Sequence, residues 1–145
     1  MNHTPAYIIA QYLIGEGFLT TPGESGDWEV YTGNLPDGDD VENNIVACMD
    51  TESVKDGRVM AGENIFHYGV QLLLRSTAYN TGYAKMDDLV DALEAVDRDT
   101  VTISTSDYRL DNITLTTSIV VIGQEEGSKR RELFSLNFLV TLKEI

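Results

Sequence analysis

Residues Gly62 to Val96 read GENIFHYGVQLLLRSTAYNTGYAKMDDLVDALEAV, and this stretch decides the fold. Its first half is rich in β-branched, aromatic and leucine residues, which predicts one long strand ending near Ser76 at the centre of a sheet. A short turn follows, and Asn80 or Thr81 is expected to cap a helix that Gly82 helps to begin. The helix is amphipathic, because its apolar side chains recur at helical spacing. They are Tyr83, Met86, Leu89, Val90, Leu93 and Val96.

The residues before this stretch predict a helix and two strands separated by polar loops. The helix begins at Thr4 or Pro5, which suit the cap and the first turn, and ends near Gly15. An irregular acidic loop separates the two strands, and the polar stretch Thr51–Gly62 is expected to contain a turn at Lys55–Arg58. The predicted strands are Trp28–Tyr31 and Ile45–Met49, the second covered on both faces.

The last third of the chain predicts strands and a long hairpin. One strand covers Val101–Thr105, and the polar stretch Ser106–Asn112 is expected to be a loop. Two runs with mostly alternating polarity, Ile113–Val121 and Phe134–Leu142, flank a glycine-containing tip at Gly123–Lys129 and predict the hairpin. We therefore expect one domain over residues 1–145, of the α+β class. An N-terminal helix and a central helix pack on an antiparallel or mixed sheet that ends in the long hairpin.

The chain is strongly acidic. It has 24 aspartates and glutamates against 10 lysines and arginines, a net charge of −14. Such a surface disfavours nucleic-acid binding and attachment to anionic membranes, both of which need basic side chains. The acidity has two readings, solubility or a surface that repels a polyanion. No apolar run is long enough to span a bilayer and no secretory signal is recognisable, so a cytoplasmic site of synthesis is the expectation.

Nothing in the sequence nominates an active site. Two histidines and one cysteine leave few partners for a nucleophile, a thiolate metal cluster or a disulfide. A glycine-rich phosphate loop and a Gly-x-Ser-x-Gly elbow are both missing from the sequence. We predict no catalytic, cofactor-binding or metal-binding residues. The helix carboxylates Asp87, Asp88, Asp91 and Glu94 point away from its apolar stripe and are expected to be solvated.

The basic residues are scarce enough to be informative. Lys129, Arg130 and Arg131 cluster where the hairpin tip meets the last strand, next to Glu132. In so acidic a chain, such a cluster is suited to an acidic surface on a second copy or another partner. The alternative is an exposed loop whose charges only aid solubility.

Four segments carry a resemblance to a known family. They are Arg58–Glu63, His67–Ser76, Tyr79–Lys85 and Arg130–Val140. With an N-terminal helix followed by a variable loop, they resemble the small minor capsid and tail-terminator proteins of long-tailed, siphovirus-like bacteriophages. The resemblance covers most of the chain and lies in length, element order and scattered residues rather than in a catalytic signature.

The resemblance implies an α+β virion protein of the phage neck that acts without covalent chemistry. Tail terminators form a hexameric ring that caps the tail tube protein, stops its polymerisation and docks to the head connector. They assemble in the host cytoplasm, and viral DNA later passes through the ring without specific binding. The residues that would line the lumen are the acids Asp37, Asp39, Asp40, Glu42, Asp87, Asp88, Asp91 and Glu94. The hairpin Ile113–Leu142 would contribute to the subunit interface, with contacts from Lys129, Arg130, Arg131 and Glu132.

Three other readings are kept open. A head-closure or connector-adaptor protein shares the virion setting but docks on the portal side. An acidic inhibitor that mimics DNA explains the charge, although the acids are scattered along the sequence rather than regularly spaced. A small enzyme is the third reading, and no residue set supports it.

Overall fold

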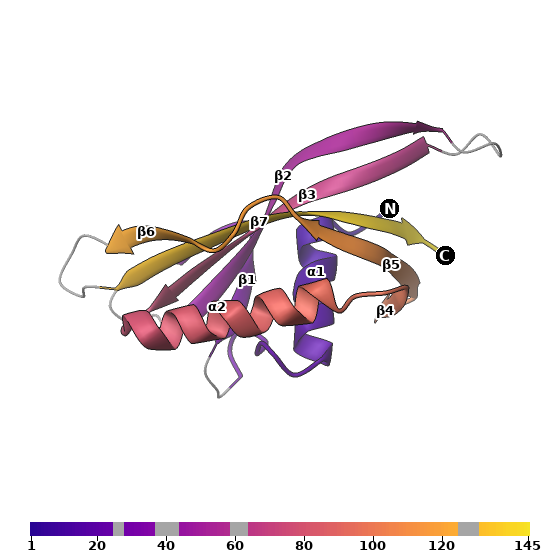
Figure 1. Cartoon of the computed structure of the whole chain (residues 1–145). Coiled ribbons are helices and arrows are strands. Elements are labelled where there is room, and N and C mark those ends of the chain that lie inside the picture. The colour runs from indigo at the N-terminus through magenta and orange to yellow at the C-terminus, as the bar shows by residue number, and fades with distance from the viewer. Residues whose placement is uncertain (25–27, 37–43, 59–63, 125–130) are drawn as a thin grey trace.

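The computed structural model describes residues 1–24, 28–36, 44–58, 64–124 and 131–145. Within these ranges two helices lie beneath one twisted sheet (Figure 1). The elements in chain order are α1 (Pro5–Gly15), β1 (Glu29–Thr32), β2 (Ile45–Arg58), β3 (Asn64–Ser76), α2 (Tyr79–Glu94), β4 (Asp99–Ile103), β5 (Ser106–Leu115), β6 (Val120–Gln124) and β7 (Glu132–Glu144). The predicted α+β class, with an N-terminal and a central helix, is confirmed.

The sheet is mixed and has β3 and β7 at its centre. Its order is β1-β2-β3-β7-β5-β4, and β6 also pairs with β7. Only β1 and β2 run parallel among the described strand pairs, and the others are antiparallel. Paired positions such as Leu72 and Leu136 point to the same face, where residues of both helices complete the hydrophobic core. The predicted coverage of both faces near Ile45–Cys48 is confirmed, because all four residues are buried.

Helix α1 begins and ends as its sequence predicts. The Thr4 hydroxyl accepts a hydrogen bond from the Tyr7 amide, and Pro5 occupies the first turn. At the other end Gly17 adopts a φ of +84°, and the Phe18 amide donates to the Leu13 carbonyl at 3.0 Å. The left-handed conformation of Gly17 allows the amides that follow the helix to donate to its last carbonyl groups. It also directs the chain back toward the sheet.

Helix α2 begins earlier than predicted. It starts at Tyr79 after Ala78, and no side chain caps it, so the expected caps Asn80 and Thr81 lie inside the first turn. Gly82 has a packing role instead. A Cβ there would lie 2.5 Å from Cε2 of Phe134, so only glycine lets the helix approach β7 this closely.

Strand β2 extends well past the predicted Ile45–Met49. It continues to Arg58, so the expected turn at Lys55–Arg58 is wrong within the described residues. Together with the first part of β3 it forms a ribbon that projects from the body of the domain (Figure 1). We name residues 51–58 and 64–67 the arm. Its residues are mainly polar and lack the alternation of apolar and polar side chains that would mark a strand in the sequence.

The C-terminal strands also differ from prediction. Ser106–Asn112, expected as a loop, is the first part of β5, because Ser104 at a φ of +54° allows a two-residue turn from β4. Tyr108 and Leu110 are buried there, between polar neighbours that face outward. The predicted strand Ile113–Val121 is interrupted after Leu115, so β5 pairs with the second half of β7 and β6 with the first half.

Candidate functional site

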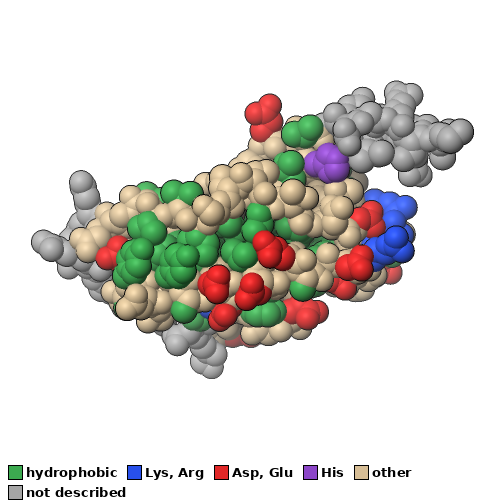
Figure 2. Space-filling view, in the orientation of Figure 1, with side chains coloured by type: hydrophobic (Ala, Val, Ile, Leu, Met, Phe, Trp, Pro, Cys, Tyr) green, Lys and Arg blue, Asp and Glu red, His purple; other side chains and the backbone are tan. Residues whose placement is uncertain are grey.

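The predicted acidic surface lies on α2. The four carboxylates Asp87, Asp88, Asp91 and Glu94 are all exposed. Figure 2 shows acidic side chains along this helix. The other candidate acids, Asp37, Asp39, Asp40 and Glu42, lie outside the described residues. Their loop starts after Pro36, whose carbonyl accepts a hydrogen bond from the buried Arg75 guanidinium at 2.7 Å.

The predicted basic cluster does not form one exposed patch. Lys129 and Arg130 lie outside the described residues, but the side chain of Arg131 is only 1% exposed. Arg131 directly precedes β7, an inner strand of the sheet, and it has interactions within the chain. The expectation that Arg131 is available to another copy is therefore wrong for the folded chain. Glu132 is half-buried, and it accepts a hydrogen bond from Gln124 at 3.0 Å.

An apolar surface that the sequence did not predict lies beside the acidic one. We name it the apolar patch, and it consists of Tyr79, Tyr83, Val120, Val121 and Ile122, which are between 41% and 54% exposed. Figure 2 shows hydrophobic side chains gathered between α2 and the strand above it. The two tyrosines stack on each other and contact Phe134, which is the cross-strand partner of Val121. Exposed apolar surface of this kind is typical of protein–protein contacts.

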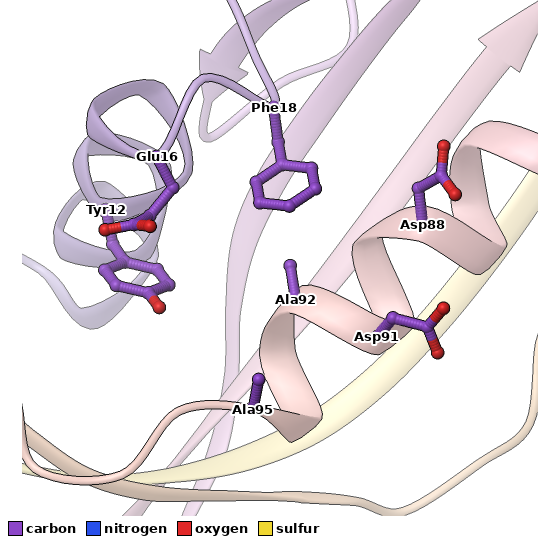
Figure 3. A pocket seen from close by; sticks show the side chains of 7 residues that line it. All are labelled: Tyr12, Glu16, Phe18, Asp88, Asp91, Ala92 and Ala95. Atoms are coloured by element: carbon purple, nitrogen blue, oxygen red, sulfur yellow. The ribbon is translucent and has the colours of Figure 1, made fainter.

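A shallow groove separates the two helices. Its volume is about 440 Å³, and it is lined by Tyr12, Glu16, Phe18, Asp88, Asp91, Ala92 and Ala95. Figure 3 shows the small Ala92 and Ala95 facing the Phe18 ring, while the Asp88 and Asp91 carboxylates point away from it. The groove therefore has an apolar floor and no convergent set of carboxylates, in keeping with the prediction of a solvated acidic face.

Lys85 joins the loop after α1 to helix α2. Its ammonium group donates a hydrogen bond to the Phe18 carbonyl and lies 5.8 Å from the centre of the Trp28 ring. Partial burial lowers the pKa of Lys85, and the nearby carboxylate of Asp88 opposes this shift. The contacts of Lys85 place the chain after α1 against the start of the acidic helix face.

Tyr12 gives the groove a measurable pH dependence. Its hydroxyl donates to Asp99 at 3.1 Å, and burial, with the charges of Asp99 and Glu16, raises the pKa of Tyr12 from 10.0 to about 12. Because the folded state favours the neutral phenol, its stabilising effect is complete below pH 10.0 and is lost as the pH rises toward about 12.

Replacing Tyr12 by phenylalanine is expected to lower the free energy of unfolding by about 0.5–1.5 kcal/mol at neutral pH, the usual net worth of one hydrogen bond. The difference between the two proteins should then shrink as the pH rises through the window of the Tyr12 pKa. Urea unfolding at a series of pH values measures both effects. A difference that stays constant into the alkaline range would contradict this role of Tyr12.

Three further findings bear on function. Among the described residues, no three histidine, cysteine, aspartate or glutamate side chains are grouped to hold a metal ion. No helix in the described part of the chain is both long and apolar enough to cross a membrane. No protein-family model and no curated protein matches the chain. The likeness to phage tail terminators therefore rests on the sequence segments quoted above.

Proposed function

We propose that this chain is a structural protein of a long-tailed phage virion, a tail terminator. In this proposal six copies form a ring that caps the tail tube, ends its polymerisation and joins the tail to the head connector. The ring acts by geometry, without a covalent step, and is built in the host cytoplasm before it becomes part of the virion neck. The sequence resemblance and the α+β fold with two helices on one sheet support this assignment.

The observation that carries the proposal is that helix α2 borders two different surfaces. Its exposed carboxylates form an acidic side, whereas Tyr79 and Tyr83 at its start belong to the apolar patch. A ring subunit needs these two properties together. The apolar surface suits contact between neighbouring copies, and the acidic surface suits a channel through which DNA must slide without binding.

The acidic side of α2 is one candidate for the channel wall, and the loop from Asp37 to Glu42 is the other. Phosphates of passing DNA are repelled by a carboxylate-lined wall, which keeps the duplex from adhering during ejection. The channel must also be roughly 20 Å or more across, because the major groove alone spans about 12 Å.

Neutralising the acidic side of α2 is expected to slow DNA ejection by about tenfold, the lower end of electrostatic effects on such encounters, while ring assembly persists. The variant replaces four acids by their amides, namely Asp87, Asp88, Asp91 and Glu94. The matched control makes the same change of charge at four exposed acids outside the acidic helix side, the arm and the apolar patch, namely Glu24, Asp97, Asp107 and Glu144. Ejection is followed by the fluorescence of a DNA-binding dye.

A parallel variant neutralises Asp37, Asp39, Asp40 and Glu42. If one of the two variants slows ejection and the control does not, that segment lines the channel. If both leave ejection and infectivity unchanged, the acidic channel is wrong, although the ring itself is not.

Mixing the purified chain with tail tubes or with filled heads separates the tail terminator from a head-closure or connector-adaptor protein. A tail terminator binds the free end of the tube and blocks the addition of more tube protein. Binding to filled heads alone would favour a protein of the portal side. Tight binding to a basic nuclease, with no binding to either particle, would favour the DNA mimic.

A further inference from the structure

The arm leaves the body of the domain with strand edges that its own sheet does not use. Among the described strands, β1 lies beside β2 only as far as Cys48, and β7 lies beside β3 only from Tyr68 onward. The arm carries apolar side chains as well. Val54 is 49% exposed, and the half-buried Phe66 stacks against Tyr68 with ring centres 5.9 Å apart. Unpaired edges with apolar side chains favour pairing with another chain.

Strand β6 presents a second unprotected edge, at the apolar patch. One side of β6 pairs with β7, and within the described part of the chain no strand lies along its other side. Natural edge strands are commonly protected by charged residues, yet β6 reads VVIGQ and contains none. Ile122 is the most exposed residue of the patch, at 54%.

The arm and the apolar patch lie at opposite ends of the molecule (Figure 1). A contact between the patch of one copy and the arm of another joins two unlike surfaces, so copies that make it in one direction only are arranged head-to-tail. Repeated head-to-tail contacts close into a ring when the rotation between copies allows it, and otherwise form a filament.

Charge favours the arm as the segment that covers the patch. Two copies that each carry a net charge of −14 repel one another over most of their surfaces. The stretch Thr51–His67, which contains the arm, is much closer to neutral, because its three acids Glu52, Asp56 and Glu63 stand against the two bases Lys55 and Arg58. The apolar patch has no carboxylate. A nearly neutral arm against a patch without acids is an approach between two copies that electrostatic repulsion opposes little.

We propose that the apolar patch of one copy binds the arm of the next copy, and that this contact is the repeated interface of the assembly. Its role as a contact within a tail-terminator ring rests on the proposed function. The contact itself is a property of the chain and is tested on the purified protein alone.

Cross-linking of engineered cysteines tests the contact directly. The buried Cys48 is first replaced by alanine, which leaves no native thiol. Val54→Cys then places a thiol on the arm and Ile122→Cys places one on the patch, at positions exposed in the folded chain. The concentrated protein is treated with a short bis-maleimide and separated by size under denaturing conditions. The control pairs Val54→Cys with Thr100→Cys, an exposed position on strand β4.

The chain that carries both thiols is expected to give a ladder of oligomers, at least about tenfold more abundant than in the control, because a specific contact raises the effective concentration of the two thiols. Each single-cysteine chain should cross-link no more than the control. Efficient linkage of Ile122→Cys to itself would show a two-fold contact between β6 edges and would overturn the proposal. Equal yields in all variants, or no linkage, would also overturn it. A ladder from a chain that binds neither tubes nor heads would overturn the tail-terminator assignment and leave this contact standing.

Discussion

Replacing Phe134 by alanine destabilises the protein by about 3–5 kcal/mol, the range for removing a fully buried aromatic side chain. Phe134 is completely buried on β7, between Leu74 of β3 and Val121 of β6. Its ring also contacts Tyr79 and Tyr83, with ring centres 5.5 Å and 6.4 Å away. The substitution removes the side chain that holds the start of α2 against the sheet, and urea unfolding followed by circular dichroism measures the loss.

Two variants serve as controls for this result. Phe134→Leu keeps most of the volume and is expected to cost less than about 1.5 kcal/mol. Phe66→Ala removes a half-buried ring from the arm and is expected to cost less than Phe134→Ala, because less apolar surface returns to water. A loss below about 1 kcal/mol for Phe134→Ala would fall well short of the range for buried aromatic rings and would contradict this packing.

Replacing Gly69 by alanine is expected to destabilise the protein by about 1–3 kcal/mol, the usual cost of forcing an extra methyl group into a packed site. A Cβ at Gly69 would meet the Thr51 hydroxyl and the Glu52 carbonyl oxygen, and that oxygen is backbone that cannot move aside freely. The register of β2 against β3 shifts between Thr51 and Val54, opposite this glycine. Gly69 therefore marks the point where the arm leaves the body of the sheet.

Hydrogen exchange separates a local effect of Gly69→Ala from a global one. We expect the amides of β2 and β3 near Gly69 to lose the most protection, and the yield of arm-to-patch cross-links to fall. Gly15→Ala is the matched control, because nothing lies within 4 Å of the added Cβ at the exposed end of α1. Alanine also favours the helix there, so that variant should be as stable as the wild type or slightly more stable. Equal stability of Gly69→Ala and Gly15→Ala would contradict the close approach at Gly69.

The parts of the fold that could be predicted are those in which local sequence and burial agree. Thr4 and Pro5 cap a helix whose apolar residues face the core, and β3 and β7 are long and rich in apolar residues. The apolar stripe of α2 is confirmed at Met86, Leu89 and Leu93, which are buried, but Tyr83 at its start is 43% exposed. In each case the local pattern that favours the helix or strand also supplies the apolar side chains that pack into the core. The sequence of the segment alone therefore predicts the element.

The arm and β5 were missed because their strands depend on partners far along the chain. Aspartate and serine are typical of turns, but here the exposed Asp107 is paired with Thr102 in the β4–β5 ladder. Gly82 was misread for a similar reason, because the Phe134 ring that requires a glycine lies 52 positions further along the sequence.

The candidate site also has one part that the sequence predicts and one part that it does not. The exposed acids of α2 follow from helical spacing alone and were predicted. The apolar patch forms only when Tyr79 and Tyr83 meet β6, a strand about forty residues later in the sequence. One signal was available, namely the consecutive apolar residues Ile119–Ile122 after a stretch in which apolar and polar residues mostly alternate. Successive side chains of a strand point to opposite faces, so a continuous apolar run places apolar side chains on the solvent face as well as on the buried one. The burial of Arg131 depended on where β7 lies in the sheet and had no local signal.

Tail length is the measurement that tests the proposed function most directly. In a phage genome that carries the gene for this chain, the gene is inactivated, and tails are measured in electron micrographs of the lysate. We predict over-long tails with a broad length distribution and no attached heads, with normal tails restored when the wild-type chain is supplied from a plasmid. Tails of normal length in the absence of the chain would contradict the assignment as a tail terminator.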